Sequence, residues 1–456
     1  MPRSSASSAV SRRRFLAATG AVSLGAALSA CGSGDAPDPS QPVSKADIAA
    51  AMKEPTELTF WTWVPNIDKE VALFHAKYPA VKVKVVNVGQ GVTHYTKLRT
   101  AIKAGRGAPD IAQIEYQAIP TFTITDSLLD LSLYGASWLE GKFVDWTWDQ
   151  VSSPGGQVWA IPQDTGPMGL LYREDIFAEH DIQVPRTWEE FAEAARKLHR
   201  ADPGVYLTNL AANEAAAWHG LLWQAGAKPY DLSGKRDIAI NVDDSISRKL
   251  GAYWGGLAEE GVISADPDFT DSWYAGLNRG KYAAWVSAAW GPAFLSGSAK
   301  ATSGKWRAAP LPQWDLTMPT SGNWGGSSSA VVKSTRNPIA AAQFAQFLNT
   351  DPASTAMLAT EQSLFPATNA LLYEDAFIGA TPSFYGGQKV NQVFADISTT
   401  ISNTFQWPPF LDQAATDWTE TVGKSFADRT DTGAALGAWQ QRLATYARGQ
   451  GFTVSS

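Results

Sequence analysis

The sequence predicts an α/β fold with more than one lobe, and three observations lead to this prediction. The chain has 456 residues, which is long for a single hydrophobic core. Strand and helix patterns alternate between residues 58 and 114. At mid-chain, residues 158–173 hold two apolar, strand-like runs joined by a short polar segment, as a crossing between lobes requires. An ordinary turn within one sheet is the alternative for this segment.

The alternation in the first part of the chain follows a βαβαβ order, which favours an α/β lobe with a largely parallel sheet. The predicted elements are a strand over 58–63, a helix over 66–78, a strand over 81–88, a helix ending near 105 and a strand over 110–114. In such sheets ligands bind beyond the carboxyl ends of the strands. The positions just after two of these strands are 63–66 and 115–117.

After the central segment, the patterns are mainly helical. Thr187 and Glu190 form a capping box that starts a helix. Further helices are predicted over 211–225, 240–262, 272–279 and from 337 onward, with a strand over 281–287 and a stiff return crossing at 306–312. The C-terminal third is helical in pattern.

Composition excludes several classes of function. The chain is 45% hydrophobic and 18% charged, as in globular proteins, and its net charge of −7 makes nucleic acid an unfavourable partner. One cysteine, Cys31, permits no intrachain disulfide, and the five histidines show no metal-ligand spacing. We expect no cofactor and no metal, although a carboxylate site for Ca²⁺ stays open.

The first 45 residues are expected to be a secretion signal followed by a tether. Residues 1–30 carry four arginines and no acidic residue before an apolar segment, as in a secretion signal, and the run Ser11–Ala17 is of the twin-arginine (Tat) type. The signal ends in LSAC, which resembles the lipobox of bacterial lipoproteins, so Cys31 is expected to be lipidated. Residues 31–45 are expected to form a flexible tether.

The candidate site residues fall on predicted loop tips. They combine aromatic, amide and carboxylate side chains without Arg or Lys: Trp63, Asn66, Glu115, Tyr116, Asp164, Asn213, Trp218, Trp273, Trp290 and Trp324. A phosphate or carboxylate ligand would favour a guanidinium, whereas a neutral polyol suits carboxylates and indole faces. Core packing is the alternative for each tryptophan.

The same inventory is compatible with a secreted glycoside hydrolase, with Glu115 and Asp164 as the pair of carboxylates. However, the sequence has no nucleophile elbow and no clear acid/base motif. Binding without catalysis is therefore the favoured interpretation, and we expect the protein not to be an enzyme.

Several segments, in order, resemble the solute-binding lipoproteins of ABC sugar importers, the extracellular family 1 group that includes maltodextrin-binding proteins. They are LTFWTW (58–63), GRGAPDI (105–111), VWAIPQDTGPMGLLYREDIF (158–177), VPRTWEEF (184–191), GKYAAWVSAAWGPAF (280–294), NWGGSSSAVV (323–332) and PIAAAQFAQFLNTDPAS (338–354). The resemblance implies a type II-like periplasmic-binding-protein fold, in which two hinged α/β lobes close on a ligand in an aromatic-lined cleft.

Carried onto this chain, the resemblance gives lobe 1 as 46–163 with 312–360 and lobe 2 as 167–308 with 361–456. Crossings are expected near 164–167, 308–312 and 360–365. Trp290 would stack on sugar, Trp324 would be the loop aromatic of the other lobe, and Gly325 and Phe365 join the expected ligand-binding set.

The expected function is capture of a neutral di- or oligosaccharide and its delivery to an ABC permease. The protein would be a monomer anchored to the outer face of the cell membrane through lipidated Cys31. Within the same superfamily, a polyamine or a glycerophosphodiester is the alternative ligand.

Overall fold

The computed structural model describes residues 41–455, so the predictions for the signal segment and for Cys31 lie outside the described residues. The first helix, α1 (Lys45–Ala51), begins where the expected tether ends, and Ser44 caps it by accepting a hydrogen bond from the Asp47 amide at 3.1 Å. Between residues 41 and 455, no helix is both long and apolar enough to cross a membrane.

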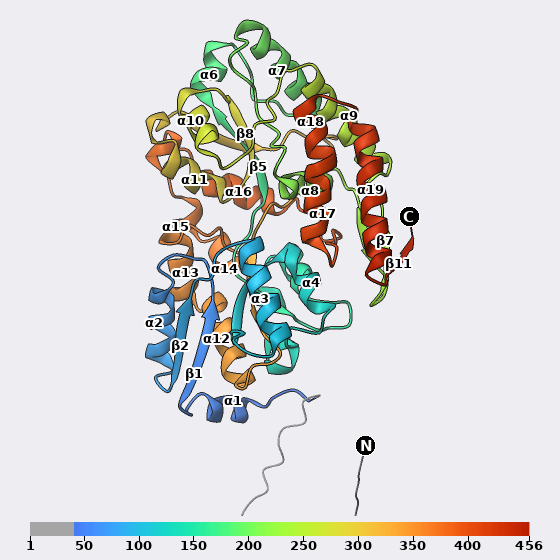
Figure 1. The fold of residues 1–456 in the computed structure, drawn as a ribbon. Helices are drawn as coiled ribbons and strands as arrows, with labels where there is room; N and C mark the ends of the chain where they lie inside the picture. The colour runs from blue at the N-terminus through green and yellow to red at the C-terminus, as the bar shows by residue number, and fades with distance from the viewer. Residues whose placement is uncertain (1–40, 456) are drawn as a thin grey trace, which may run out of the picture. The chain divides into compact units, whose positions relative to one another are not determined.

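The first lobe is built around a five-stranded sheet in the order β2-β1-β3-β10-β4 (Figure 1). Its strands are β1 (Thr56–Trp61), β2 (Val81–Val86), β3 (Ile111–Glu115), β4 (Ala160–Pro162) and β10 (Ser327–Val331). Strands β1, β2 and β3 are parallel, and β10 pairs antiparallel with β3 and β4. The predicted βαβαβ order of 58–114 is confirmed.

Helices flank this sheet and supply its core. They are α2 (Asp68–Lys77), α3 (Val92–Ala104), α4 (Ile119–Thr123), α5 (Asp145–Val151), α12 (Pro338–Thr350) and α13 (Pro352–Thr360). In the core, the ring of Phe344 from α12 lies 5.4 Å from Phe60 and 5.1 Å from Phe74, centroid to centroid. The late segment α12 therefore completes a core that the first hundred residues begin.

The second lobe contains two small sheets. One has the order β8-β5-β9, from β5 (Met168–Arg173), β8 (Ala284–Ala288) and β9 (Trp306–Pro310), and all its pairings are antiparallel. The other has the order β11-β7-β6, from β6 (Tyr230–Leu232), β7 (Asp237–Ile240) and β11 (Thr453–Ser455). The chain end therefore pairs with a strand more than two hundred positions earlier.

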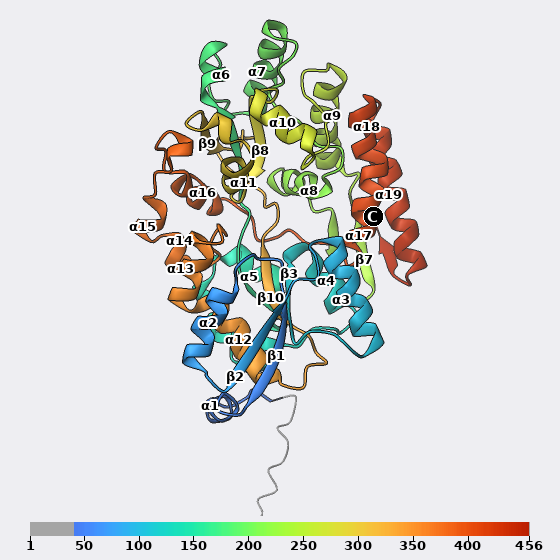
Figure 2. The same cartoon turned by 60° about the vertical axis from the view of Figure 1, so that its left-hand side comes forward.

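The helices of this lobe are α6 (Glu174–Glu179), α7 (Trp188–Ala201), α8 (Ala215–Gln224), α9 (Ser245–Glu259), α10 (Asp271–Arg279), α11 (Gly291–Ser298), α16 (Val390–Ser398), α17 (Leu411–Trp418), α18 (Lys424–Asp428) and α19 (Thr432–Gly449). Both views place α17, α18 and α19 beside α8 and α9 (Figures 1 and 2). The predicted start of α7 is confirmed, because the Thr187 hydroxyl accepts a hydrogen bond from the Glu190 amide at 3.1 Å.

The polar segment 163–167 links the two lobes, since β4 belongs to the first sheet and β5 to the second. A turn within one sheet, the alternative for this segment, does not occur. The chain does not return to the first lobe at the expected crossing, 308–312. Residues 306–310 instead form strand β9, and every residue of β9 pairs with β5. Pro310 is the last residue of this strand, where a missing amide donor is tolerated, and Pro312 lies beyond it.

The last passage between lobes also differs from the expected position, 360–365. Residues up to 369 still contact the first lobe: the Val144 amide donates to the Ala367 carbonyl at 3.0 Å, and Asn369 Nδ2 donates to the Phe143 carbonyl at 2.8 Å. The short helices α14 (Asn369–Leu372) and α15 (Asp375–Ile378) follow, and α16 packs on β5 and β9. The chain therefore changes lobe between residues 370 and 389.

Candidate functional site

The link between the lobes carries Asp164, which is only 9% exposed. Its Oδ1 accepts hydrogen bonds from the amide and the hydroxyl of Ser327 at the start of β10. Its Oδ2 accepts no hydrogen bond from any described residue. Burial raises the pKa of this carboxyl to about 6 against the opposing effect of the Ser327 hydrogen bonds, and Glu115 raises it further.

Tyr116, directly after β3, holds the link from the first lobe. Its ring is fully buried, and its hydroxyl donates to the Asp164 carbonyl at 2.9 Å. A Cβ on Gly326 would lie 2.8 Å from this ring and 2.9 Å from the same carbonyl, at a φ of +83°. Only glycine fits between Tyr116 and the link without strain, which fixes one residue of the predicted NWGG motif.

Glu115 lies at the carboxyl end of β3, where the predicted α/β lobe placed it. Its Oε2 accepts a hydrogen bond from Tyr95 of α3 at 2.8 Å, and burial raises its pKa. Trp63, beyond β1, packs edge-to-face on His94 at 5.0 Å and on Tyr95 at 6.5 Å. Trp63, Glu115 and Tyr95 therefore form one contiguous group at the carboxyl edge of the first sheet.

Trp290 and Trp324 meet at the junction of the lobes. Their ring centroids lie 4.8 Å apart at an interplanar angle of 82°, and Trp290 Nε1 donates to the Trp324 carbonyl at 2.7 Å. Gly325, at a φ of +84°, would place a Cβ 3.1 Å from Trp290 Nε1. Trp324 is 5% exposed and Trp290 is half-buried. Trp290 therefore retains accessible ring surface.

A third aromatic side chain, Phe269, joins this pair and was not expected from the sequence. Its ring lies 6.2 Å from Trp290 and 6.4 Å from Trp324, yet the residue is 36% exposed. Its φ of +62° is a left-handed conformation that a bulky residue rarely adopts. Residues held in such sparsely populated backbone conformations cluster at active sites and ligand clamps, which makes Phe269 a candidate for a functional role. The only signal in the sequence was an aromatic residue between two Asp residues in a predicted loop.

Two further carboxylates lie in the second lobe, and sequence reasoning missed both. They are Glu214, before α8, and Asp268, next to Phe269. Burial raises the pKa of each to about 7, and the charge of Asp268 and then of Glu115 raises that of Glu214. The charge of Glu115 raises the pKa of both Asp164 and Glu214, so Glu115 is coupled to a carboxylate of the link and to one of the second lobe. In residues 41–455, no group of three His, Cys, Asp or Glu side chains is arranged to hold a metal ion.

Four predicted residues do not have the expected surroundings. Trp218 is fully buried against Trp418 and Phe426 inside the second lobe, because α8 is apolar on all sides, so it is withdrawn as a ligand contact. Trp273, 1% exposed, packs behind Phe269 at 5.6 Å. Phe365, 4% exposed, packs on Phe377 and Phe394. The side chain of Asn66 is exposed and makes no hydrogen bond to described residues.

Asn213 is exposed, and its side chain makes hydrogen bonds to the backbone of the loop that contains Asp268. Its Oδ1 accepts a hydrogen bond from the Asp268 amide at 3.0 Å, and its Nδ2 donates to the Asp268 carbonyl at 3.4 Å. These two bonds hold Asp268 and the adjacent Phe269 in place. Asn213 and Trp273 are therefore positioning residues for a surface that Phe269 presents.

The raised pKa of Glu214 gives a stability prediction. The folded pKa, about 7, exceeds the ordinary value, so the folded state binds the proton more tightly than the unfolded chain does. This contribution is fully present below about pH 4.5 and is lost as the pH rises through 7. Glu214→Gln removes the titration. Without sugar, the melting temperature of the wild type relative to Glu214→Gln should fall between pH 4.5 and 7.5; parallel curves would contradict the assignment.

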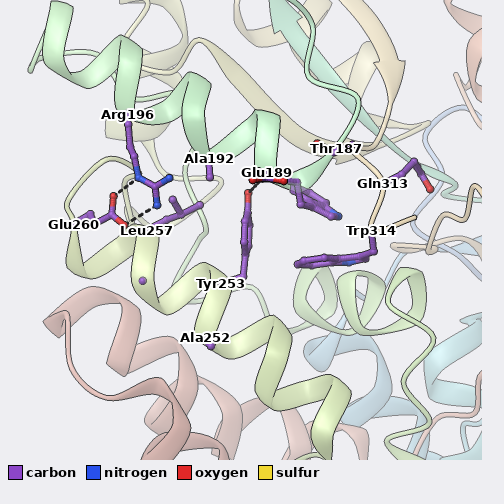
Figure 3. Close-up of a pocket in the computed structure, with 12 residues that line it drawn as sticks. Thr187, Glu189, Ala192, Arg196, Ala252, Tyr253, Leu257, Glu260, Gln313 and Trp314 are labelled. Atoms are coloured by element: carbon purple, nitrogen blue, oxygen red, sulfur yellow. Dashed lines mark hydrogen bonds and ion pairs between the residues drawn. The ribbon is translucent and has the colours of Figure 1, made fainter. Parts of the chain in front are cut away.

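A separate surface pocket of about 510 Å³ lies between α7 and α9 (Figure 3). Trp188, Tyr253 and Trp314 form its aromatic wall, and the Arg196–Glu260 ion pair forms its far end, with Nε to Oε2 at 2.6 Å. Tyr253 donates to the Trp188 carbonyl, and Trp314 packs on Tyr253 at 5.3 Å. None of the predicted site residues lines this pocket, so it is distinct from the site at the lobe junction.

Comparisons with known proteins give one consistent family. The family described as "Bacterial extracellular solute-binding protein" matches residues 60–355. The ABC transporter associated binding protein from B. animalis subsp. lactis Bl-04, solved with beta-1,6-galactobiose, is 32% identical with a TM-score of 0.76, covering 88% of this chain and 99% of its own.

Two further relatives agree. The galacto-N-biose-/lacto-N-biose I-binding protein from Bifidobacterium longum, solved with lacto-N-biose, is 26% identical with a TM-score of 0.77, covering 88% of this chain and 98% of its own. A lactose-binding protein from Rhizobium radiobacter is 26% identical over 384 residues, 78% of this chain and 86% of that protein. The fold of these relatives is the two-lobe solute-binding fold that the sequence predicted.

Proposed function

The chain belongs to the bacterial extracellular solute-binding protein family, and from this we propose that it captures a neutral di- or oligosaccharide outside the cytoplasm and delivers it to an ABC permease. Membership gives the binding role and the extracytoplasmic location. The relatives named above bind or were solved with galactose-containing disaccharides or lactose, which supports a sugar as the ligand.

The observation that carries the proposal is the chemistry of the junction between lobes. Trp290, Trp324 and Phe269 form one aromatic group, and Phe269 directly follows Asp268, whose charge, like that of Glu115, acts on Glu214. The proposed contacts include no Arg or Lys. Aromatic faces stack on the C–H faces of sugar rings, and carboxylates accept hydrogen bonds from hydroxyls. A phosphate or uronate would be repelled by these carboxylates. A polyamine is compatible with them and is the alternative that the experiment must separate.

We propose that the ligand contacts comprise Trp63, Glu115, Asp164, Trp290, Trp324 and Phe269, with Glu214 and Asp268 as hydrogen-bond acceptors. Tyr116, Asn213, Trp273 and Gly325 position these residues. We do not include Asn66 and Phe365, both predicted contacts, because the Asn66 side chain is exposed without a hydrogen bond to described residues and Phe365 is buried against Phe377 and Phe394. Asp164 Oδ2 would accept a sugar hydroxyl, since Oδ1 is already held by Ser327.

We propose lobe boundaries that follow these contacts. Lobe 1 takes residues 46–163 and 327–369, and lobe 2 takes residues 168–323 and 390–455, with three linking segments between them. The support is the sheet membership of β4, β5, β9 and β10. The second part of lobe 1 begins later than the position expected from the sequence, residue 312. The reason is that the Gln313 carbonyl accepts a hydrogen bond from the Trp188 amide of lobe 2 at 3.2 Å.

We propose that the mature protein is a monomer held at the outer face of the cell membrane by a lipid on Cys31. The sequence LSAC at the end of the signal segment supports this. Cell fractionation tests it: Cys31→Ala should move the protein from the membrane fraction to the soluble fraction. Retention of the variant in the membrane fraction would overturn the lipid anchor.

The strained conformation of Phe269 gives a prediction that separates binding from stability. Both Phe269→Ala and Phe269→Gly remove the ring and should weaken sugar binding about fivefold or more. A left-handed conformation disfavours alanine by about 1 kcal/mol relative to glycine, so Phe269→Gly should melt higher than Phe269→Ala. Calorimetry and thermal melts measure the two effects. Wild-type affinity in both variants would exclude Phe269 from the site.

The function is tested by a thermal-shift screen of the purified protein. Ligands are beta-1,6-galactobiose, lacto-N-biose, lactose, galactose, spermidine and glycerol 3-phosphate. A ligand at 100 times its dissociation constant should stabilise the fold by about 2.7 kcal/mol. We expect a shift with a disaccharide and no cleaved product after several hours. A shift with spermidine or glycerol 3-phosphate alone would overturn the sugar, and cleaved sugar would support the hydrolase.

A further inference from the structure

A cavity of about 610 Å³ lies between the two lobes, away from the tryptophan group. The first lobe contributes Arg99 and Lys103 from α3 and Phe122 from α4. The second lobe contributes Arg236, Phe410 and Phe452. In the views of Figures 1 and 2, α3 and α4 lie on the side of the first lobe that faces β7 and the C-terminal strand β11. We call this cavity the interlobe basic pocket.

The charge of the interlobe basic pocket contrasts with that of the chain. Its described lining includes three cationic side chains and no acidic one, whereas the whole chain carries a net charge of −7. Lys103 is exposed and forms no ion pair with a described residue. Arg236 Nη1 donates to the Gln450 carbonyl at 3.1 Å, which fixes its guanidinium without neutralising it. The pocket therefore presents a local positive potential to an anionic partner.

The floor of the pocket is apolar. Phe122 and Phe410 are 1% and 7% exposed, and the Phe410 ring lies 5.6 Å from Tyr446 and 5.7 Å from Phe452. A small inorganic ion would leave most of this surface uncovered. A peptide segment with carboxylates on either side of an apolar side chain would match both the cations at the rim and the aromatic floor.

The pocket also depends on the arrangement of the lobes. Arg99 Nη2, on the first lobe, donates to Asp412 Oδ2, on α17 of the second lobe, at 2.6 Å. This bond crosses the wall of the pocket and partly neutralises Arg99. Because each lobe supplies part of the lining, rotation of one lobe against the other would separate Lys103 from Arg236.

We propose that the interlobe basic pocket is a docking site for an acidic segment of the ABC permease, one that carries an apolar side chain between carboxylates. This inference rests on the proposed function, which supplies a permease as the partner. Since both lobes form the pocket, the affinity for such a segment would depend on how the two lobes are arranged. The permease would thus distinguish the open from the closed protein by the shape and charge of this one pocket.

The test uses a fluorescein-labelled peptide, Gly-Glu-Asp-Phe-Glu-Asp-Gly, and its binding to the purified full chain by anisotropy at low and high salt. We expect salt-sensitive binding that the double variant Lys103→Glu with Arg236→Glu weakens about fivefold or more. Lys84→Glu, an exposed lysine on β2 of the first lobe with no ion pair to a described residue, is the matched control and should bind as wild type does. A peptide with Gly in place of Phe should bind more weakly.

Three outcomes would overturn the proposal. The first is no binding of the peptide, and the second is equal binding by the double variant and the wild type. The third is that the Phe and Gly peptides bind with equal affinity and that inorganic phosphate displaces both. The last would indicate a small-anion site only. The neutral double variant Lys103→Gln with Arg236→Gln should give an intermediate loss if the charge-reversed protein folds poorly. Sugar affinity in the double variants should stay within about twofold, so failure of sugar binding in the wild type would count against the proposed function alone.

Discussion

Replacement of Trp290 by Ala should weaken binding of the disaccharide by tenfold or more. The half-buried indole of Trp290 stands at the junction of the lobes, 4.8 Å from Trp324, and keeps accessible ring surface. Loss of a stacking aromatic removes more than about 1.4 kcal/mol, which is tenfold in affinity. The variant also loses the hydrogen bond from Nε1 to the Trp324 carbonyl, which orders the facing loop.

Calorimetry with the sugar found in the screen measures this effect. Trp138→Ala is the matched control, because Trp138 is 67% exposed and lies on the first lobe beside Lys45 of α1. Its affinity should match that of the wild type. Trp290→Phe keeps a ring without the N–H donor and should fall between the two. If Trp290→Ala binds as tightly as the wild type does, Trp290 is not a ligand contact.

The second large effect is expected from Gly166→Ala in the link between the lobes. A Cβ at this position would lie 1.9 Å from the Trp324 carbonyl oxygen and 3.3 Å from Trp290 Nε1. Backbone must therefore move, since the Trp324 amide also donates to the Gly166 carbonyl at 2.8 Å. Forced overpacking of this kind costs about 1–3 kcal/mol. We expect a lower melting temperature and a loss of sugar binding together, because the displaced segment carries Trp324.

Gly256→Ala is the control for this substitution. Gly256 lies inside helix α9, and apart from the backbone of that helix and its two chain neighbours no atom lies within 4 Å of the position of an added Cβ. Alanine should stabilise this helix by about 0.5–1 kcal/mol, the opposite sign to Gly166→Ala. Equal melting temperatures for Gly166→Ala and the wild type would show that the link is less tightly packed than the contacts indicate.

Local patterns in the sequence were sufficient for most of the elements. The alternation VKVKVV forms strand β2, and Thr187 with Glu190 starts α7 where the capping pattern placed it. These features succeed because they depend on neighbours within a few residues. The return crossing at 308–312 failed for the opposite reason. Two prolines indicated a linker, whereas pairing with β5, more than a hundred residues earlier, makes this segment an edge strand.

By itself the sequence determined the α/β elements and the family resemblance, and it predicted an aromatic and carboxylate site that includes Glu115, Asp164, Trp290 and Trp324. Only the tertiary structure decided which of these residues meet. Asp164 is held by Ser327, 163 positions away, and the charges of Asp268 and Glu115 act on Glu214, although these residues lie far apart in the sequence. The tertiary structure also removed Trp218 from the candidate ligand contacts, because α17 packs over α8 and buries this side chain. Contacts between distant segments are set by long-range packing, which no local pattern encodes.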